Sequence, residues 1–427
     1  MIKIYSGDEI KTEEIMARGG DSVDVSAVVK EIIENVKRRG DAALREYAEK
    51  FDGGAPESII VSKDEIDAAF ESVDKELVAV MAEARDNIRA FHVLQVRQGF
   101  RTPEKDGIVL GQKITPIEKV GIYVPGGTAS LSSTVLMNAI PAKIAGCSEI
   151  SMATPAKAGR VAPEILVAAA LAGVDKIYKT GGAGAIAALA YGTETVGKVD
   201  KIVGPGNVFV AEAKRQVFGI VGIDMIAGPS EILIVADDGA KARNVAADML
   251  SQAEHDKMAT AVLVTDSEAL AHDVAKELER QIPLLPRAEI ARASIDGQGK
   301  IIIRKSIEKV IETANEIAPE HLELCVKKPF VLLDKVKNAG SIFLGYNCPE
   351  ALGDYFAGPN HTLPTSGTAR FSSPLSVDDF IKKSSFIHYT AAALDKVAWK
   401  IDRFAKSEGL DAHARSATIR YEKESEK

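Results

Sequence analysis

The stretch VGIYVPGG at positions 120–127 begins the pattern that decides the fold of this chain. It is a short apolar run that ends in a glycine-rich turn. Similar short runs follow at 149–153, 176–180, 201–203 and 231–235, and the segments between them have helical character. Strands that alternate with helices form βαβ units, so we assign residues 106–235 to an α/β domain with a mostly parallel sheet.

The same alternation continues outward along the chain. Apolar runs at 261–265, 300–303, 322–326 and 341–344 predict a second α/β domain over residues 236–372. Apolar residues at helical spacing predict that residues 1–105 form an N-terminal helical region that packs on the core. After Phe371 the sequence becomes polar and helical, which predicts a helical tail over 373–427. The expected fold is therefore α/β, with two Rossmann-like domains, N-terminal helices and a C-terminal helical tail.

Composition and charge exclude several classes of function. The 427 residues are 46% hydrophobic and 27% charged, which is enough to bury a large core in at least two domains. A net charge of −8 without a basic block argues against nucleic acid as a partner. The N-terminus lacks the order of a signal peptide, and no apolar run reaches membrane-spanning length. Together with three scattered cysteines, these features predict a soluble cytoplasmic protein that does not contact membranes.

Four of the seven histidines lie in segments rich in metal-binding and acid/base side chains, at 251–255, 318–321, 353–361 and 409–413. On a helix, Gln252 and His255 would share one face and could point at one cation. Asp354 and His413 could complete the set. Each segment alone is better explained by an exposed histidine or a turn aspartate, but together they favour a metal site. Because the set lacks thiolates, it suits catalytic zinc better than closed structural zinc.

Glu320 and His321 are the best candidates for acid/base catalysis. Oxidation of an alcohol needs a base beside the hydroxyl group and a nicotinamide on the other side of the carbon. Oxidation of the resulting aldehyde needs an activated water as well. If the backbone after Pro319 forms a turn, both side chains can reach one site. The alternative is a solvated glutamate and a packed histidine. Cys325 could attack an aldehyde, but the run 321–326 predicts a strand in which this cysteine is ordinary packing.

Glycine-rich turns mark where a nucleotide could bind. The segment 182–187 matches the dinucleotide pattern G-x-G-x-x-A, but it does not follow the first strand of its sheet, and such matches often arise by chance. The turns at 123–127 and 204–207 are better candidates. Each places backbone amides and a polar side chain at the carboxyl end of a strand.

Several of these motifs resemble those of the histidinol dehydrogenase family, NAD- and zinc-dependent enzymes that complete histidine biosynthesis. The similarity covers nearly the whole chain. It implies a four-electron oxidation of L-histidinol through L-histidinal to L-histidine. The matching segments, in order, are VGIYVPGG at 120–127, GPGN at 204–207, AGPSE at 227–231, SQAEHD at 251–256, APEHLEL at 318–324 and GDYFAGPNHTLPTSGTARFSS at 353–373.

The resemblance also implies a role for each matched residue. His321 would take the alcohol proton, and Glu320 would activate water for the second oxidation. One zinc ion per subunit would be held by Gln252, His255, Asp354 and His413. The substrate would contact these four ligands and Ser230, His321, His361 and Glu408.

For NAD, the resemblance implies contacts with Tyr123 and Asn207. The family usually has a glutamine at the position of Gly184, and this glutamine contacts the cofactor. The cofactor would therefore lie beside Gly184, where this chain lacks that side chain.

Other functions make different demands on the sequence. Relatives with this fold oxidise other small alcohols, such as sulfonated diols, but Glu408 and the segment 357–367 favour histidinol. A zinc hydrolase would not need Tyr123 or the turn at 204–207. A metal-binding protein without activity would not be expected to keep Glu320 and His321. The resemblance further implies a homodimer in which the tail crosses over and brings Glu408 and His413 to the partner's active site.

Overall fold

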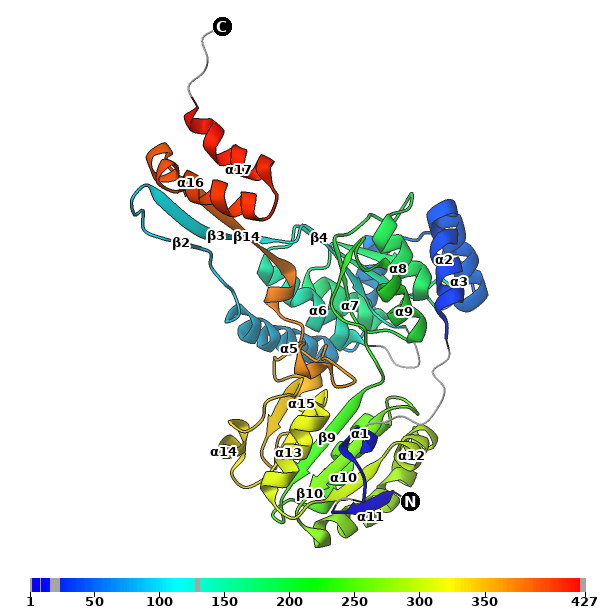
Figure 1. Ribbon diagram of the computed structural model, residues 1–427. Helices are drawn as coiled ribbons and strands as arrows, with labels where there is room; N and C mark the ends of the chain where they lie inside the picture. Colours follow the sequence, from blue (N-terminus) through cyan, green and yellow to red (C-terminus); the bar gives the residue numbers. More distant parts are fainter. Residues whose placement is uncertain (1, 8, 16–23, 127–130, 423–427) are drawn as a thin grey trace. The chain divides into compact units, whose positions relative to one another are not determined.

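The computed structural model describes residues 2–7, 9–15, 24–126 and 131–422, which fall into two units (Figure 1). The main unit consists of Met1–Val96 and Ile117–Phe380, and the satellite unit consists of Arg97–Pro116 and Ile381–Lys427. None of the helices in the described part has both the length and the apolar character needed to cross a bilayer.

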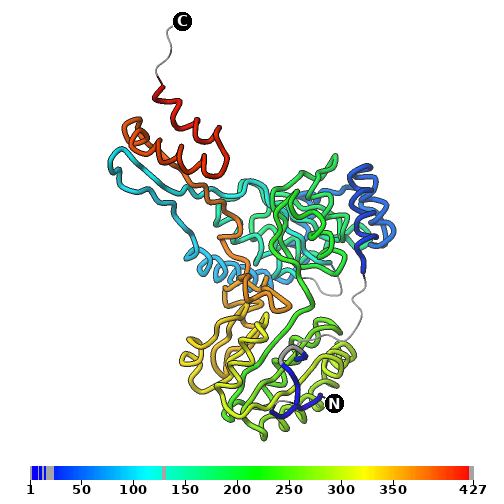
Figure 2. The backbone as a smooth tube through the Cα atoms, in the orientation of Figure 1, coloured from blue at the N-terminus to red at the C-terminus, as the bar shows by residue number. Residues whose placement is uncertain are grey.

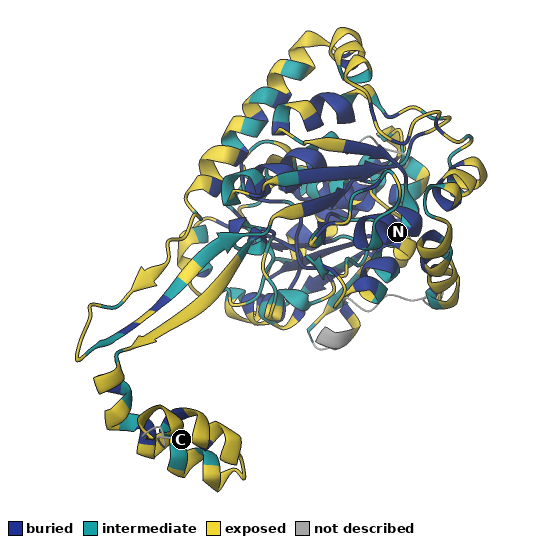
Figure 3. Ribbon diagram, turned by 90° about the horizontal axis from the view of Figure 1, so that it is seen from above, coloured by how far each residue is buried: buried dark blue, intermediate teal, exposed yellow. Residues whose placement is uncertain are grey.

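The first sheet of the main unit is parallel throughout, with the strand order β6-β5-β4-β7-β8. Its longer strands are buried on both faces because helices cover both sides (Figure 3). The strands are β4 (Lys119–Tyr123), β5 (Glu149–Thr154), β6 (Lys176–Lys179), β7 (Lys201–Val203) and β8 (Gly222–Ile223). The helices between them are α6 (Ser132–Ala145), α7 (Pro163–Ala172), α8 (Gly182–Tyr191) and α9 (Val208–Val217).

The second sheet is also parallel, with the order β1-β11-β10-β9-β12-β13. Separate hydrophobic clusters cover its two faces. The strands are β1 (Lys3–Ser6), β9 (Glu231–Ala236), β10 (Thr260–Thr265), β11 (Lys300–Ile303), β12 (His321–Cys325) and β13 (Ser341–Leu344). The helices are α1 (Thr12–Ile15), α10 (Ala242–Ala253), α11 (Glu268–Gln281), α12 (Ala288–Gly297), α13 (Ile307–Ile317), α14 (Pro329–Leu333) and α15 (Glu350–Tyr355).

The N-terminal helices pack on the outside of the first sheet's helices. Residues of α2 (Ser26–Arg39) and α3 (Asp41–Phe51) contact α8, while α4 (Lys63–Ser72) contacts α7 and α5 (Lys75–Val93) contacts α6. The N-terminus of α4 is fixed by a capping box in which the side chains and backbone amides of Ser62 and Glu65 bond reciprocally. These helices therefore form an outer layer against α6, α7 and α8.

The satellite unit is an antiparallel sheet with the order β14-β3-β2, together with two helices. In Figure 2 the cyan segment 108–116 runs beside the orange segment 381–389. The elements are β2 (Phe100–Arg101), β3 (Ile108–Pro116), β14 (Ile381–Tyr389), α16 (Ala391–Ser407) and α17 (Asp411–Thr418).

The expected α/β class with two parallel sheets is confirmed, but three local expectations differ from the structure. The strand at 231–235 was expected in the first domain and instead forms β9, in the middle of the second sheet. The N-terminal region was expected to be helical, but it contributes β1 to the same sheet. The tail was expected to be helical from 373, yet its residues 381–389 form β14, which pairs with β3. In each case the deciding partner strand is distant in sequence, so local pattern could not reveal it.

Candidate active site

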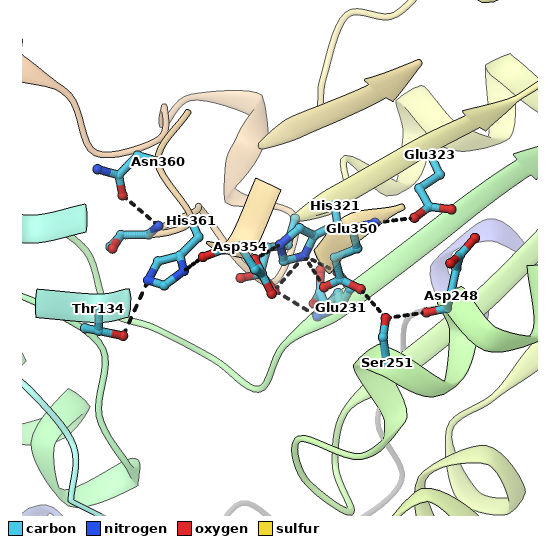
Figure 4. A network of polar contacts seen from close by, with 12 residues as sticks. Thr134, Glu231, Asp248, Ser251, His321, Glu323, Glu350, Asp354, Asn360 and His361 are labelled. Carbon is cyan, nitrogen blue, oxygen red and sulfur yellow. Dashed lines mark hydrogen bonds and ion pairs between the residues drawn. The ribbon is translucent and has the colours of Figure 1, made fainter. Parts of the chain in front are cut away.

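Glu320 and His321 lie where strand β12 begins, beside the start of β9. The backbone of Glu231, the first residue of β9, holds both side chains, and Figure 4 shows Glu231 beside His321. The Glu231 N–H donates to Glu320 Oε2 at 2.8 Å, and the Glu231 carbonyl accepts from His321 Nδ1 at 3.0 Å. The two side chains therefore reach the same place, as the sequence predicted. In the structure His321 is the first strand residue after α13 and a short connection.

The hydrogen bond to the Glu231 carbonyl fixes the protonation pattern of a neutral His321. A carbonyl can only accept, so Nδ1 carries the proton and Nε2 keeps its lone pair. His321 Nε2 is buried and has no hydrogen-bond partner among the described residues, and Asp354 Oδ1 lies 3.7 Å from it. A neutral imidazole held in this way is suited to accept a proton at Nε2.

Buried carboxyl groups set the electrostatics around His321. Burial raises the pKa of Glu320 to about 8 and that of Glu350 to about 7. Burial by itself lowers the pKa of His321, but the negative charges of Glu350, Glu320 and Asp354 outweigh burial and raise it well above its usual value. Glu350 Oε1 lies 3.4 Å from His321 Nδ1. Strongly perturbed groups that gather in one place are a mark of catalytic sites.

The expected metal ligands Gln252, His255 and Asp354 all belong to the main unit. Gln252 is in the last turn of α10 and is 1% exposed, and its Oε1 has no hydrogen-bond partner in the described part of the chain. His255 was expected on the same helix. It lies instead in the turn after α10, where its N–H donates to the Gln252 carbonyl at 3.1 Å. An unsatisfied buried amide oxygen is a costly feature that a cation would satisfy.

Asp354 stands among three histidines. The pKa of Asp354 is lowered because neighbouring His321 outweighs the effect of burial, and His361 and His255 act in the same direction. Burial lowers the pKa of both His255 and His361, which favours the neutral imidazole that a metal requires. The Nδ1 of His361 donates to the Asp354 carbonyl at 3.0 Å, and its Nε2 lies 3.4 Å from Thr134 Oγ1 (Figure 4).

The expected cofactor residues lie at the other sheet of the main unit. Tyr123 ends β4, is 3% exposed, and accepts a hydrogen bond at its hydroxyl from the Gly182 N–H at 3.0 Å. Asn207 caps α9, and its Oδ1 accepts from the N–H groups of Phe209 and Val210. Gly184 is in the first turn of α8, where a Cβ would meet Tyr47 at 3.4 Å in ordinary van der Waals contact. All three surround the carboxyl edge of the five-stranded sheet.

Comparison with known proteins identifies the family. A family model described as histidinol dehydrogenase matches residues 16–421. A histidinol dehydrogenase of Bacillus anthracis is 56% identical over 400 residues, which is 94% of this chain and 93% of that protein. One from Listeria monocytogenes is 52% identical over 417 residues, 98% of this chain and 97% of that protein. The crystal structure of histidinol dehydrogenase from Elizabethkingia anophelis matches with a TM-score of 0.94 and 40% identity, covering 98% of each chain.

The chain belongs to the histidinol dehydrogenase family. It is an NAD-dependent oxidoreductase, as the motifs predicted, and histidinol dehydrogenase activity is favoured over oxidation of another small alcohol.

The remaining expected residues of the histidinol dehydrogenase site are spread over both units. Ser230 is half-buried and directly precedes Glu231, and its carbonyl accepts from the Thr260 N–H at 3.0 Å. Glu408 and His413 belong to the satellite unit and are both exposed in the single chain. Glu408 caps the end of α16, and His413 is in the first turn of α17.

Sequence reasoning missed the polar residues that support the catalytic pair. Glu350 lies beside His321 and accepts from the Ser251 hydroxyl at 3.1 Å, while Glu323 Oε1 accepts from the Glu350 N–H at 2.8 Å. The Glu231 side chain accepts from the Ser366 N–H at 3.0 Å. The sequence offered one signal for Glu323. Strand residues two apart share a face, so Glu323 lies on the same face of β12 as His321. Cys325 shares that face and is buried, and burial raises the pKa of its thiol, so the packing role is supported.

Proposed function

We propose that this protein oxidises L-histidinol through L-histidinal to L-histidine, with His321 and Glu320 as the two bases. The observation that carries the proposal is their common anchor on the Glu231 backbone, which points two groups with perturbed pKa values at one place. Bound NAD would accept the hydride in each oxidation. Membership of a biosynthetic family also supports our expectation that the protein works in the cytoplasm.

The two bases serve different half-reactions. In the first, the neutral form of His321 takes the hydroxyl proton of the alcohol at Nε2, and because the pKa of His321 is raised, the share of this form increases with pH. In the second, Glu320 removes a proton from the water that adds to the aldehyde. Burial raises the pKa of Glu320 to about 8, so its carboxylate is a stronger base than an exposed glutamate.

Gln252, His255 and Asp354 fit a zinc site that His413 would complete. Gln252 Oε1 has no hydrogen-bond partner within the described ranges, His255 is held neutral, and the ionised form of Asp354 is favoured. An amide oxygen, a carboxylate and imidazoles suit a borderline cation such as Zn²⁺ with open positions. Zinc would bind and orient the amino and imidazole nitrogens of the substrate. Ser230, His361 and Glu408 would then contact the bound substrate.

We further propose a homodimer whose active sites are shared through the satellite unit. His413 and Glu408 lie on this small unit, whose single-chain surface carries many exposed apolar side chains. Burial of such side chains against a second copy would stabilise a dimer. Phe380, which we had expected to be part of the exchanged tail, is instead fully buried in the main unit. The exposed apolar side chains of the tail that a partner could bury are Phe386, Ile387, Trp399 and Phe404.

The direct test of function is the stoichiometry of the reaction. Purified zinc-loaded enzyme is given limiting L-histidinol with excess NAD, and NADH absorbance and the product are measured. We expect two NADH per histidinol, with histidine as product, and slower turnover on a panel of small diols. One NADH per substrate, or faster oxidation of a diol, would contradict the proposal.

The zinc proposal is tested by metal content and activity together. We expect the His255→Ala variant to lose its bound zinc on dialysis and to lose activity. Added zinc should restore the activity of the dialysed parent enzyme. The matched control is His272→Ala, because His272 is an exposed histidine on α11 outside the site. Full activity in His255→Ala after exhaustive chelation would remove zinc from the mechanism.

The shared site is tested by complementation between two inactive variants. His413→Ala and His255→Ala chains are mixed under conditions that allow subunits to exchange. With shared sites, a heterodimer has one site with both lesions and one with neither, so about half of the parent activity should return per heterodimer. If each site is built within one chain, every site keeps a lesion and no activity returns.

A further inference from the structure

An ion pair that is closed to solvent holds the loop at 204–207, which we call the cofactor loop. Lys214 lies on α9, Asp224 directly follows β8, and their side chains are 2% and 1% exposed. The Lys214 ammonium group is paired with Asp224 Oδ1. Removing two charges from water cancels much of their attraction, so a buried ion pair is weak evidence for stability alone.

The N–H and the carbonyl group of Gly204 both form hydrogen bonds with this ion pair. The Gly204 N–H donates to Asp224 Oδ2 at 2.8 Å, and the Gly204 carbonyl accepts from Lys214 Nζ at 2.9 Å. The carboxylate is anchored from its own side by the Met225 N–H, which donates to Asp224 Oδ1 at 2.6 Å. The pair thus fixes the peptide groups on both sides of Gly204.

The backbone conformation and the close surroundings of Gly204 allow only glycine at this position. Its φ is +110°, and a Cβ there would lie 2.2 Å from the Tyr123 carbonyl oxygen, so only glycine fits. The loop therefore lies directly against the carboxyl end of β4. Asn207 follows three residues later and caps α9, so a shift of Gly204 would also move Asn207 and the first turn of that helix.

We propose that Lys214 and Asp224 are positioning residues for NAD. By fixing Gly204 they hold the amides of the cofactor loop and the Asn207 side chain in the arrangement that binds the cofactor. The inference rests on the proposed cofactor site at this loop. Neither residue needs to touch NAD, and within the described part of the chain neither forms a hydrogen bond or ion pair with Glu320 or His321, so the pair should control cofactor affinity rather than proton transfer.

The test compares cofactor affinity in Lys214→Met and Asp224→Asn with the parent enzyme. NADH fluorescence gives the dissociation constant, and zinc content and kcat at saturating NAD are measured on the same samples. Because displaced amides and a displaced Asn207 side chain would lose hydrogen bonds to the cofactor, we expect NAD and NADH to bind at least about tenfold more weakly. Zinc content and kcat should stay near the parent values. Parent affinity in both variants would overturn the inference.

Lys143→Met is the matched control. Lys143 pairs with Asp175, whose Oδ2 accepts from the Ile150 N–H at 2.7 Å, so this pair also holds a backbone amide of the same sheet. It lies at the amino ends of β5 and β6, away from the cofactor loop. We expect unchanged NAD affinity. Weakening as large as that in Lys214→Met would show a general loss of structure and would contradict the inference.

A double variant separates positioning from stability. Lys214→Met with Asp224→Leu removes both charges without leaving one buried and unpaired, so it should fold even if a single variant does not. If its Tm returns to the parent value while NAD still binds weakly, the pair positions the loop. If NAD affinity returns together with Tm, the pair is only structural and the inference is wrong.

Asn207→Ala distinguishes failure of the inference from failure of the proposed site. If Asn207→Ala binds NAD as the parent does, the cofactor site at this loop is wrong. If it binds weakly while the Lys214 and Asp224 variants bind normally, the site stands and the positioning role is wrong.

Discussion

The two parallel sheets of the main unit present their functional groups at opposite edges. In the five-stranded sheet, Tyr123, the start of α8 and the cofactor loop follow the carboxyl ends of strands. In the six-stranded sheet, Glu231 and His321 are the first residues of β9 and β12, at the amino edge. Open α/β sheets usually bind ligands outside their carboxyl ends, so the second sheet departs from the rule.

Helix direction gives a physical reason for the difference. In βαβ units the helix N-termini lie at the carboxyl edge of the sheet, and the C-termini lie at the amino edge. N-terminal amides attract the phosphates of a dinucleotide, whereas C-terminal carbonyls favour cations. His255 follows the end of α10, and Glu320 follows the end of α13. The two edges therefore suit an anionic cofactor and a cationic metal, respectively.

At the carboxyl edge of the six-stranded sheet, an aspartate occupies backbone amides by internal hydrogen bonds. At the switch point between β9 and β12, Asp237 accepts from the N–H groups of Gly239 and Lys327 and from the Tyr346 hydroxyl. The carboxylate satisfies the amides that a ligand phosphate would otherwise meet. The same fold thus has the proposed cofactor site at the carboxyl edge of one sheet and internal hydrogen bonds at that edge of the other.

Loss of the base at the amino edge should have the largest effect. We expect His321→Asn to lower kcat for histidinol oxidation by roughly 100- to 10,000-fold, the range typical of acid–base catalysis. NAD affinity should be unchanged, because the proposed cofactor residues belong to the other sheet. Steady-state kinetics and NADH fluorescence measure the two quantities. A loss of NAD affinity as large as the loss of kcat would contradict the assignment of the catalytic base and the cofactor to different sheets.

Glu320→Gln should slow histidinal oxidation by about 100-fold and histidinol oxidation less, because only the aldehyde step needs activated water. A base acts when ionised, and burial raises the pKa of Glu320 to about 8, so the parent rate with histidinal should rise as pH increases through this value. The variant should lose that rise. Parent-like turnover of supplied histidinal would show that the role given to Glu320 is wrong.

Asp237→Ala should affect stability without affecting catalysis. Loss of its hydrogen bonds to Gly239, Lys327 and Tyr346 should lower the free energy of unfolding by about 1–3 kcal/mol. Urea unfolding measures the change, and kcat and the KM for NAD should match the parent. A clear change in the KM for NAD would mean that this edge also takes part in cofactor binding.

The smallest expected effect is at Gly184. A Cβ there meets only ordinary contacts, so a side chain can begin at this position, and we expect a glutamine to add a hydrogen bond to the cofactor. One such bond is worth about 0.5–1.5 kcal/mol, so Gly184→Gln should lower the KM for NAD several-fold. Gly184→Ala is the control for helix propensity, which glycine reduces. An unchanged or raised KM in Gly184→Gln alone would show that the loop is organised around glycine.

The sequence by itself determined the class of fold, the family and most candidate residues. Its strands and helices follow from local apolar spacing, and motifs such as APEHLEL carry their residue types in contiguous stretches. Neither depends on knowing which segments meet in space.

Only the tertiary structure decided which strands pair and which atoms support the chemistry. The place of β9 between β10 and β12 depends on partners found later in the chain, as does the pairing of β14 with β3. Glu231 acts through its backbone, which no side-chain pattern records, and Glu350 reaches His321 only because α15 packs there. These non-local pairings decide at which edge of the sheet the proposed catalytic groups lie. Contacts between distant segments set the order and direction of the strands, whereas the local sequence encodes only the segments themselves.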